Sequence, residues 1–154
     1  MALLVGRYIN KIDKKGRVSV PKAFRKAFER QEFNGVYSYP LFKSPTIEVC
    51  SEIFMTRLSN SLDDLDMFSD EQDDLGAIIM NNAEALPLDL EGRIVLPNRF
   101  LHHTEIKTDT LFVGRGRRFQ IWNPDLFERH NKKAFERARA KGVILKLCSK
   151  EEEA

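Results

Sequence analysis

One ten-residue pattern occurs twice in this chain. The segment Ile12-Asp-Lys-Lys-Gly-Arg-Val-Ser-Val-Pro21 returns as Leu88-Asp-Leu-Glu-Gly-Arg-Ile-Val-Leu-Pro97. Both copies follow Asp-X-X-Gly-Arg-apolar-X-apolar-Pro, at a constant spacing of 76 residues (89 − 13). Each copy of an internal repeat is a supersecondary unit whose apolar face needs a partner to cover it. We therefore expect the two copies to cover each other.

Length and composition indicate one folded, soluble unit. The chain has 154 residues, of which 42% are hydrophobic and 31% are charged, as in ordinary globular proteins. Eleven phenylalanines indicate a Phe-rich core. The apolar stretch in residues 1–6 is too short for a secretion signal or a membrane span. We expect a cytoplasmic protein with no membrane partner.

Neither the cysteines nor the histidines form a catalytic or metal-binding pattern. Cys50 and Cys148 lie far apart and outside any Cys-X-X-Cys pair, so we expect reduced thiols, with Cys50 buried. His102 and His103 are adjacent, which points them in different directions on a helix, and His130 stands alone. Because no nucleophile with a base and no ligand spacing is present, we expect no enzyme activity, no metal, no cofactor and no small-molecule substrate.

Charge is strongly segregated, although the formal net charge is only +2. Residues 11–30 contain eight bases and two acids, and residues 115–141 contain nine bases and three acids. Residues 60–74 contain seven acids and no base. The acidic run lacks the spacing of a calcium loop and indicates a solvated helix face or a partner for the basic zones. The basic zones are typical of nucleic-acid contact.

The first copy of the pattern predicts a hairpin. Residues 6–10 and 17–20 flank a polar loop, and the alternation in the second segment places its valines on one face and Arg17 on the other. Gly16 supplies the positive φ that a short loop needs, and Asp13 can bond its side chain to the loop amides. Arg17 is then at the mouth of the loop and points outward.

The segments after the first loop predict a helix, two strands and a second helix. Pro21 suits the first position of a helix because its φ is fixed and no N–H is needed there. Residues 35–39 and 46–50 have the composition of strands, and Ser51 is an acceptable N-cap for the helix that follows. Ser69 and Gln72 are spaced as a capping box within a mostly helical connector.

The second half repeats this order. We expect a strand before Pro97, a short helix at 98–103 and strands at 111–113 and 118–122. Asn123 and Pro124 combine an N-cap side chain with a proline at the first helical position, and Gly142 is a plausible end for that helix. We assign no structure to residues 148–154, which end in an acidic tail.

The two motif arginines have a structural and a functional interpretation. In the first, Asp13 pairs with Arg17 and Asp89 pairs with Arg93, which only fastens each loop. In the second, each guanidinium binds guanine O6 and N7 in the DNA major groove. Ion pairing alone does not explain the surrounding basic zone, so we favour DNA contact. Flanking phosphate contacts would come from Lys14, Lys15, Lys22 and Arg25.

A third arginine cluster is open to two interpretations. The segment Gly114-Arg-Gly-Arg-Arg118 lacks both a Walker Lys-Ser/Thr and a complete Gly-X-Gly-X-X-Gly. It is therefore either a strand turn with solvated arginines or a place where Arg115 and Arg117 contact backbone phosphates.

The chain resembles the MraZ family over nearly its whole length. The resemblance rests on the paired Asp-X-X-Gly-Arg-X-X-X-Pro motifs, on Gly6-Arg7-Tyr8 and on Phe119-Gln-Ile-Trp122. It implies a bacterial transcriptional regulator of the AbrB-like swapped-hairpin class, which represses the division and cell-wall gene cluster. Such proteins form rings of many subunits and bind short direct repeats in a promoter.

The resemblance also assigns roles by position. It implies that Arg17 and Arg93 contact DNA, that Asp13 and Asp89 order the loops, and that the motif glycines permit the turns; these glycines are Gly16 and Gly92. The first loop carries two lysines where the second carries Leu90 and Glu91, so the two copies differ in charge.

Together these observations predict an α+β protein of two pseudo-symmetric AbrB-like repeats, forming a mixed β core with flanking helices. We expect a first repeat at 1–55, an acidic helical connector at 56–84, a second repeat at 85–130 and a basic C-terminal helix and tail at 131–154. The expected partners are double-stranded promoter DNA and further copies of the chain, with association to the nucleoid. The alternative is a ring-forming protein-interaction module without specific DNA binding.

Overall fold

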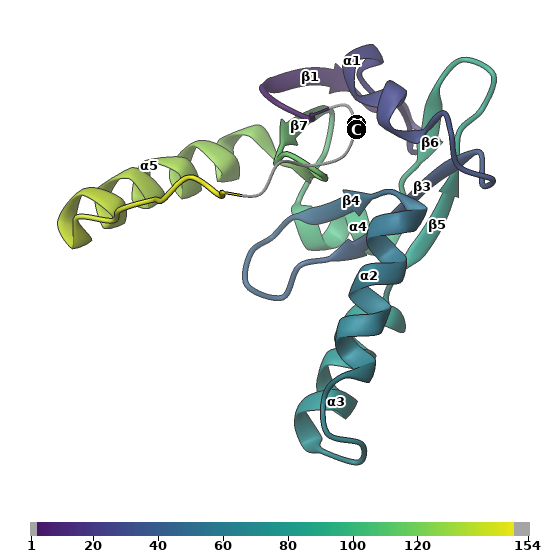
Figure 1. The fold of residues 1–154 in the computed structure, drawn as a ribbon. Helices are drawn as coiled ribbons and strands as arrows, with labels where there is room; N and C mark the ends of the chain where they lie inside the picture. The colour runs from purple at the N-terminus through teal and green to yellow at the C-terminus, as the bar shows by residue number, and fades with distance from the viewer. Residues whose placement is uncertain (1–2, 150–154) are drawn as a thin grey trace.

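The structure is a computed structural model that describes residues 3–149 (Figure 1). Its strands are β1 (Arg7–Lys11), β2 (Arg17–Ser19), β3 (Gly35–Pro40), β4 (Ile47–Cys50), β5 (Glu84–Pro87), β6 (Arg93–Val95), β7 (Asp109–Gly114) and β8 (Phe119–Trp122). Its α-helices are α1 (Lys22–Arg25), α2 (Glu52–Asp63), α3 (Asp70–Leu75), α4 (Asn98–Thr104) and α5 (Pro124–Lys141). A 3₁₀ turn, η1 (Lys26–Phe28), extends α1, and a π-helical turn, η2 (Gly76–Met80), extends α3. The fold is therefore α+β, as the sequence predicts.

Strands from the two copies are interleaved within the sheets. A six-stranded sheet has the order β1-β7-β8-β4-β3-β5, and β2 and β6 form a separate two-stranded sheet. The first strand of each copy pairs with the other copy, since β1 pairs with β7 and β5 pairs with β3. The β2–β6 and β4–β8 pairs also join the two copies. The prediction that the copies cover each other is confirmed.

The registers show an approximate two-fold relation between the copies. In the β2–β6 sheet Val18 pairs with Ile94, its counterpart at the 76-residue spacing. In the β4–β8 pair Glu48 pairs with Gln120, with two further pairs placed symmetrically on either side. An axis of this kind reverses strand direction between equivalent strands, so they meet antiparallel.

Two expectations about strand pairing are wrong. Residues 6–10 and 17–20 do not form a hairpin with each other, because β1 and β2 each pair with a strand of the second copy. The expected mixed core is also wrong, since all six pairings between named strands are antiparallel. Alternation of apolar residues specifies which face of a strand is buried, but it does not specify which other strand pairs with its edge.

Helix termini follow the local sequence signals. The Ser51 hydroxyl accepts a hydrogen bond from Phe54 N at 3.2 Å at the start of α2. Asn123 caps α5, Pro124 occupies its first position, and Gly142 ends it with a φ of 59°. Pro21 is one residue off its predicted place: it is the N-cap of α1 rather than its first helical residue.

The predicted capping box is only half formed. The Ser69 hydroxyl accepts from Gln72 N at 3.1 Å, as expected. The Gln72 side chain does not return this bond, and its amide donates instead to the carbonyls of Leu62 and Leu65. The amide thereby joins α3 to the end of α2.

The core is rich in phenylalanine, as expected. Phe24, Phe112 and Phe119 are buried in the main cluster, where the rings of Phe24 and Phe119 lie 5.2 Å apart. Val18 of β2 and Ile94 of β6 enter the same cluster, as do Val20 and Leu96 directly after the two strands. The motif repeats thus supply both the loops and part of the core beneath them.

Two helical segments project from this body in different directions (Figure 1). One is formed by α2, α3 and η2, and the other is the distal part of α5. Within residues 3–149 no helix is long and apolar enough to cross a membrane. Of the tail to which we assigned no structure, Cys148 and Ser149 lie in no helix or strand, and residues 150–154 are outside the described part of the chain.

Candidate nucleic-acid interface

The first motif loop is organised around the carboxylate of Asp13. One oxygen, Oδ1, accepts hydrogen bonds from the backbone N–H groups of Lys15 and Arg17, both at 2.9 Å. The other, Oδ2, accepts from Arg17 Nε at 2.6 Å. A single side chain therefore closes the turn and holds the guanidinium.

The second motif loop has the same geometry. Asp89 Oδ1 accepts from the N–H groups of Glu91 and Arg93 at 2.9 Å, and Oδ2 accepts from Arg93 Nε at 2.8 Å. The backbone bonds from Asp89 N to Arg93 O and from Gly92 N to Asp89 O also have counterparts in the first loop. The repeat of the sequence is thus a repeat of atomic arrangement.

The glycine in each loop has a backbone that other residues rarely adopt. Gly16 has a φ of 82° and Gly92 a φ of 76°, both in the left-handed region. A Cβ at Gly16 would also lie 3.0 Å from the carbonyl oxygen of Leu96, and one at Gly92 would collide with the Arg25 guanidinium. Gly92 therefore provides both the turn and the space for Arg25.

The two aspartates are held in their ionised form. The backbone N–H of Arg17, followed by its side chain and Lys15 N–H, lowers the pKa of Asp13 against a smaller opposing effect of burial. The Arg93 N–H does the same for the pKa of Asp89, and the Asp89 carboxylate raises the pKa of Arg93. Each loop therefore stays closed around a carboxylate–guanidinium pair at neutral pH.

The ends of the two guanidinium groups differ in their surroundings. Among the described residues, the terminal nitrogens of Arg17 have no hydrogen bond or ion pair within the chain. Arg93 Nη1 lies 3.6 Å from the carboxylate of Glu91. Because Nε is held by aspartate in both loops, the two Nη groups of each arginine form a fork whose orientation is restricted. Arg17 offers this fork without a competing carboxylate.

The β2–β6 sheet joins the two loops. Backbone bonds from Val20 N to Gly92 O and from Leu96 N to Gly16 O, at 3.0 and 2.8 Å, connect each loop to the strand of the other copy. The two arginine forks are therefore parts of one rigid platform, which neither copy can form alone.

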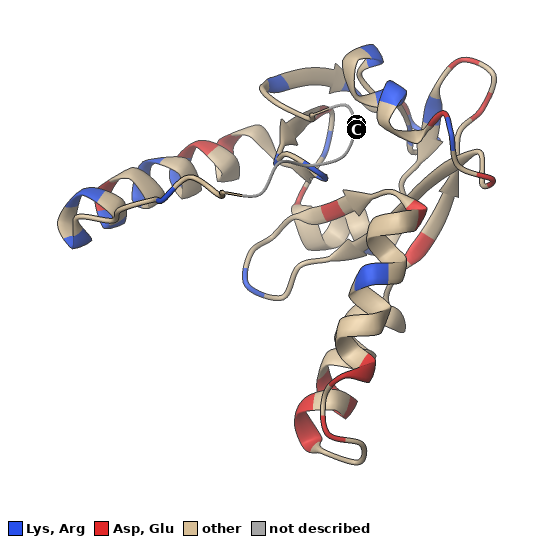
Figure 2. Cartoon of the chain, viewed as in Figure 1, with Lys and Arg blue, Asp and Glu red and all other residues tan. Residues whose placement is uncertain are grey.

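The predicted phosphate contacts are divided between the loops. Lys14 and Lys15 are exposed on the first loop. Lys22 and Arg25 instead border a groove between α1 and the second loop, and Arg25 Nη1 donates to Glu91 O at 3.4 Å. Lys26 lines the same groove, a residue that the sequence reasoning left out although it lies in the first basic zone. Figure 2 shows blue segments of α1 and η1 near the second loop.

This arrangement reduces the charge difference between the copies. The second loop has no lysine of its own, but the helix of the first copy supplies cations to it. The residue equivalent to Arg25 in the second copy, at the 76-residue spacing, is Leu101, which packs against the core. Only the second loop therefore has an arginine lying over its glycine.

Arg115 and Arg117 are not part of this platform. They lie in the turn between β7 and β8, beside Gly6 and Leu4 at the start of β1. The first motif loop follows the other end of β1, which is about 17 Å away at roughly 3.4 Å per residue. The neighbouring Arg118 pairs with the buried carboxylate of Glu48.

The Glu48 pair belongs to a buried chain of hydrogen bonds that the sequence did not reveal. Gln120 Nε2 donates to Glu48 Oε2 and Trp122 Nε1 donates to Gln120 Oε1, both at 2.8 Å. Glu48 and Gln120 face each other on β4 and β8. The network joins the two copies at the centre of the sheet, so Arg118 has a structural role.

Two of the three histidines, His103 and His130, occupy structural positions. His103 Nε2 is within 3.2 Å of the carbonyls of Leu41 and Ser44, and the His130 ring stacks on Trp122 at 4.8 Å. Burial, followed by Arg137 and Arg115, lowers the pKa of His130. In the described part of the chain no group of three His, Cys, Asp or Glu is placed to hold a metal.

Comparison with known proteins identifies relatives over almost the whole chain. A family model described as "MraZ protein, putative antitoxin-like" matches residues 79–143. A transcriptional regulator MraZ from Pelagibacter ubique is 42% identical over 144 residues, covering 94% of this chain and 93% of the relative. Proteins of the same name from Rickettsia felis and Rickettsia akari are 36% and 37% identical, covering 98% and 90% of their own lengths. The chain, with its two aspartate-closed arginine loops, belongs to the MraZ family.

Proposed function

We propose that this protein is a sequence-specific DNA-binding transcriptional regulator that reads promoter DNA with its two motif loops. The observation that carries the proposal is the duplicated arginine fork: Arg17 and Arg93 are each held at Nε by an aspartate, on loops joined by the β2–β6 sheet. A planar guanidinium of fixed orientation matches guanine O6 and N7 in the major groove. The names of the relatives, transcriptional regulators, support this function.

The surrounding cations suit the backbone of the same duplex. Lys14 and Lys15 at the first loop and Lys22, Arg25 and Lys26 at the second flank the two forks on exposed or half-exposed positions. Contacts to phosphate position a protein on DNA, and contacts to base edges specify the sequence. We therefore assign the lysines and Arg25 to phosphates, and Arg17 and Arg93 to bases.

The turn that carries Arg115 and Arg117 is remote from the forks of the same chain. We assign these two arginines to phosphates outside the segment that the loops read. Bent DNA, or DNA shared between neighbouring subunits, brings such a surface into reach.

We further propose that the protein represses the division and cell-wall gene cluster as a nucleoid-associated ring of many copies, each with the AbrB-like exchange of strands between its repeats. One pair of small loops contacts few bases and binds weakly. Joining many such pairs raises the effective concentration of each later contact, so direct repeats in a promoter are bound with avidity. This gain in avidity supports binding to operators that are built of short repeats.

A gel-shift competition tests the proposed function. The labelled probe carries the direct repeats upstream of the division and cell-wall cluster, and the competitors are the same duplex and a scrambled duplex at fixed salt, because DNA affinity depends steeply on salt. We expect the wild type to prefer the repeats. Arg17→Ala should lose about 1–3 kcal/mol of this preference, the range for one bidentate base contact.

Lys43→Ala is the control, since it removes an exposed cation of the β3–β4 loop, outside both motif loops and both projecting segments. Equal competition by both duplexes against the wild type contradicts the proposal and favours the protein-interaction module. An Arg17→Ala protein with undiminished preference excludes this arginine as the base-reading group.

A further inference from the structure

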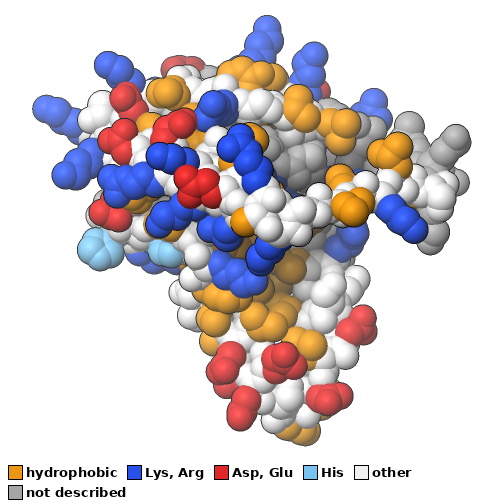
Figure 3. Space-filling model, turned by 90° about the vertical axis from the view of Figure 1, so that its left-hand side faces the viewer, with side chains coloured by type: hydrophobic (Ala, Val, Ile, Leu, Met, Phe, Trp, Pro, Cys, Tyr) orange, Lys and Arg blue, Asp and Glu red, His pale blue; other side chains and the backbone are white. Residues whose placement is uncertain are grey.

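The projection formed by α2, α3 and η2, residues 52–80, is an acidic arm. It contains eight acids and one base, Arg57. Figure 2 shows the acids concentrated at its far end, and Figure 3 shows the same end from another side. Charge of one sign at the end of a protruding element favours association with a surface of the opposite sign.

The tip of the acidic arm also exposes apolar side chains. Phe68 is 95% exposed and Met67 is 75% exposed. The backbone of Phe68 has a φ of 69°, a conformation that is costly for a bulky residue. Phe68 and Met67 line an open hollow of about 690 Å³ together with Asp70, Asp73 and residues of η2. The hollow therefore combines apolar walls with an acidic rim.

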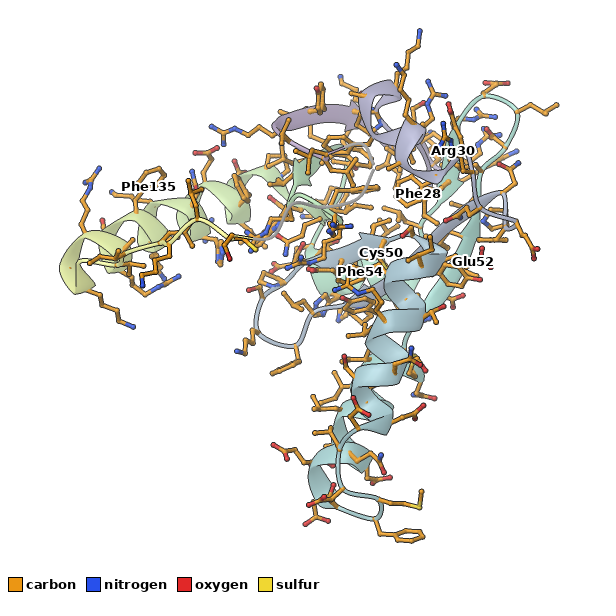
Figure 4. All side chains as sticks on the ribbon, viewed as in Figure 1. Phe28, Arg30, Cys50, Glu52, Phe54 and Phe135 are labelled. Atoms are coloured by element: carbon orange, nitrogen blue, oxygen red, sulfur yellow. The ribbon has the colours of Figure 1, made fainter. Side chains whose placement is uncertain are left out.

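The distal part of α5, residues 129–141, is a basic arm with the opposite character. It contains six Lys and Arg residues and one acid, Glu136. Phe135 is 57% exposed on this arm, and Arg139 lies over its ring at 5.8 Å. Figure 4 labels Phe135 on the projecting half of the helix, away from the sheet. The basic arm thus carries an aromatic side chain among cations.

The two arms cannot satisfy each other within one chain as it is folded. They project from the body in different directions (Figure 1), and among the described residues no ion pair joins them. The two arms are opposite in charge, and each of them exposes apolar side chains. A second copy of the chain offers both complements at once.

We propose that the acidic arm of one copy binds the basic arm of the next, with Phe135 seated in the hollow beside Phe68 and Met67. The contact joins two different surfaces, so it is head-to-tail and produces a closed ring or a filament, according to the rotation between copies. This inference names the surfaces used in the self-assembly that is part of the proposed function, and rests on it. The motif loops take no part in the contact.

Charge reversal tests the pairing of the arms. One variant carries Asp66→Lys, Asp70→Lys and Asp73→Lys, and a second carries Lys132→Glu, Lys133→Glu and Arg137→Glu. Light scattering after gel filtration, at fixed salt and protein concentration, gives the mass. We expect the wild type to be an assembly and each variant to fall towards the single-chain mass of 17.8 kDa.

Restoring complementarity should restore assembly. A chain that carries all six reversals, and an equimolar mixture of the two three-fold variants, should both regain the mass of an assembly. Phe135→Ala should reduce the mass, whereas Phe42→Ala, which removes a phenylalanine of similar exposure (56%) from the β3–β4 loop, should leave it unchanged. Thermal unfolding of every variant separates loss of docking from loss of folding.

The outcomes that overturn the inference are separate from those that overturn DNA recognition. A monomeric wild type, three-fold variants of unchanged mass, or no recovery in the six-fold variant refutes the docking of the arms. Loss of binding to a single-repeat duplex by the Lys132, Lys133 and Arg137 variant, with its mass unchanged, instead makes the basic arm a DNA surface. If the masses follow the prediction while the repeats are not preferred over scrambled DNA, the docking stands and the DNA function falls.

Discussion

The pairing of Val18 with Ile94 makes the strand pairing between the two copies measurable. The two side chains face each other across β2 and β6, and they are 1% and 0% exposed. Directly opposed residues of an antiparallel pair have Cβ atoms about 4.5–5.5 Å apart. If this register holds, the contribution of each residue to the free energy of unfolding depends on the other, although they are 76 residues apart in sequence.

The expected free energies follow from the atoms removed. Ile94→Ala deletes three buried carbons, worth about 2.4 kcal/mol at roughly 0.8 kcal/mol each, and the cavity brings the cost to about 2–5 kcal/mol. Val18→Ala deletes two carbons, for about 1.6 kcal/mol plus a smaller cavity term. Val95→Ala, on the same strand but 52% exposed, should cost no more than about 0.5 kcal/mol.

Urea unfolding of the wild type, the two single variants and the double variant gives the coupling. Because the side chains are in contact, the double variant should differ from the sum of the singles by about 0.5 kcal/mol or more. Additivity within about 0.3 kcal/mol, or equal costs for Ile94→Ala and Val95→Ala, would refute the register and with it the shared platform of the loops.

Three further predictions concern charge and chemistry. Lys14→Ala should weaken binding to specific and scrambled DNA equally, and it should reduce the slope of log affinity against log salt by about 1. Fluorescence anisotropy across a salt series measures both effects. A selective loss of affinity for specific DNA contradicts a phosphate role. Asp13 and Asp89 have lowered pKa values in the folded state. Their contribution to stability is therefore complete above the ordinary pKa of 3.8 and is lost as pH falls through the lowered values. Carboxyl pKa values at or above 3.8 in an NMR titration of the folded protein would disprove this. Burial, with the charge of Glu48, raises the pKa of Cys50 to about 12. At pH 8 a thiol reagent should therefore modify only Cys148 in the native chain and both cysteines after denaturation. Rapid modification of Cys50 in the native protein contradicts its burial.

Much of the local structure could be predicted because it depends on neighbours in the chain. An aspartate four residues before an arginine, with a glycine between them, closes the same turn twice. Ser51, Asn123 and Gly142 mark helix ends because their caps bond to amides or adopt a φ within the same turn. The candidate DNA interface is predictable to the same degree, because the ion pairs of both loops follow from short-range spacing.

The sequence pattern does not specify how the two loops lie relative to each other. A strand offers the same backbone donors and acceptors to any neighbour, so the alternation in residues 17–20 predicted a buried face and left the partner open. The closest partner in sequence, β1, was the wrong one, because the two-fold relation between the copies brings β6 there instead. For the same reason Arg25 lies on the loop of the other copy.

The sequence by itself therefore determined the duplicated turn, its ion pair and the segregation of charge. Tertiary structure alone decided that Arg17 and Arg93 share one platform, that α1 supplies cations to the second loop, and that Arg115 and Arg117 lie apart from both. Local turns depend on bonds within about four residues, whereas these juxtapositions depend on which apolar faces and strand edges are buried together.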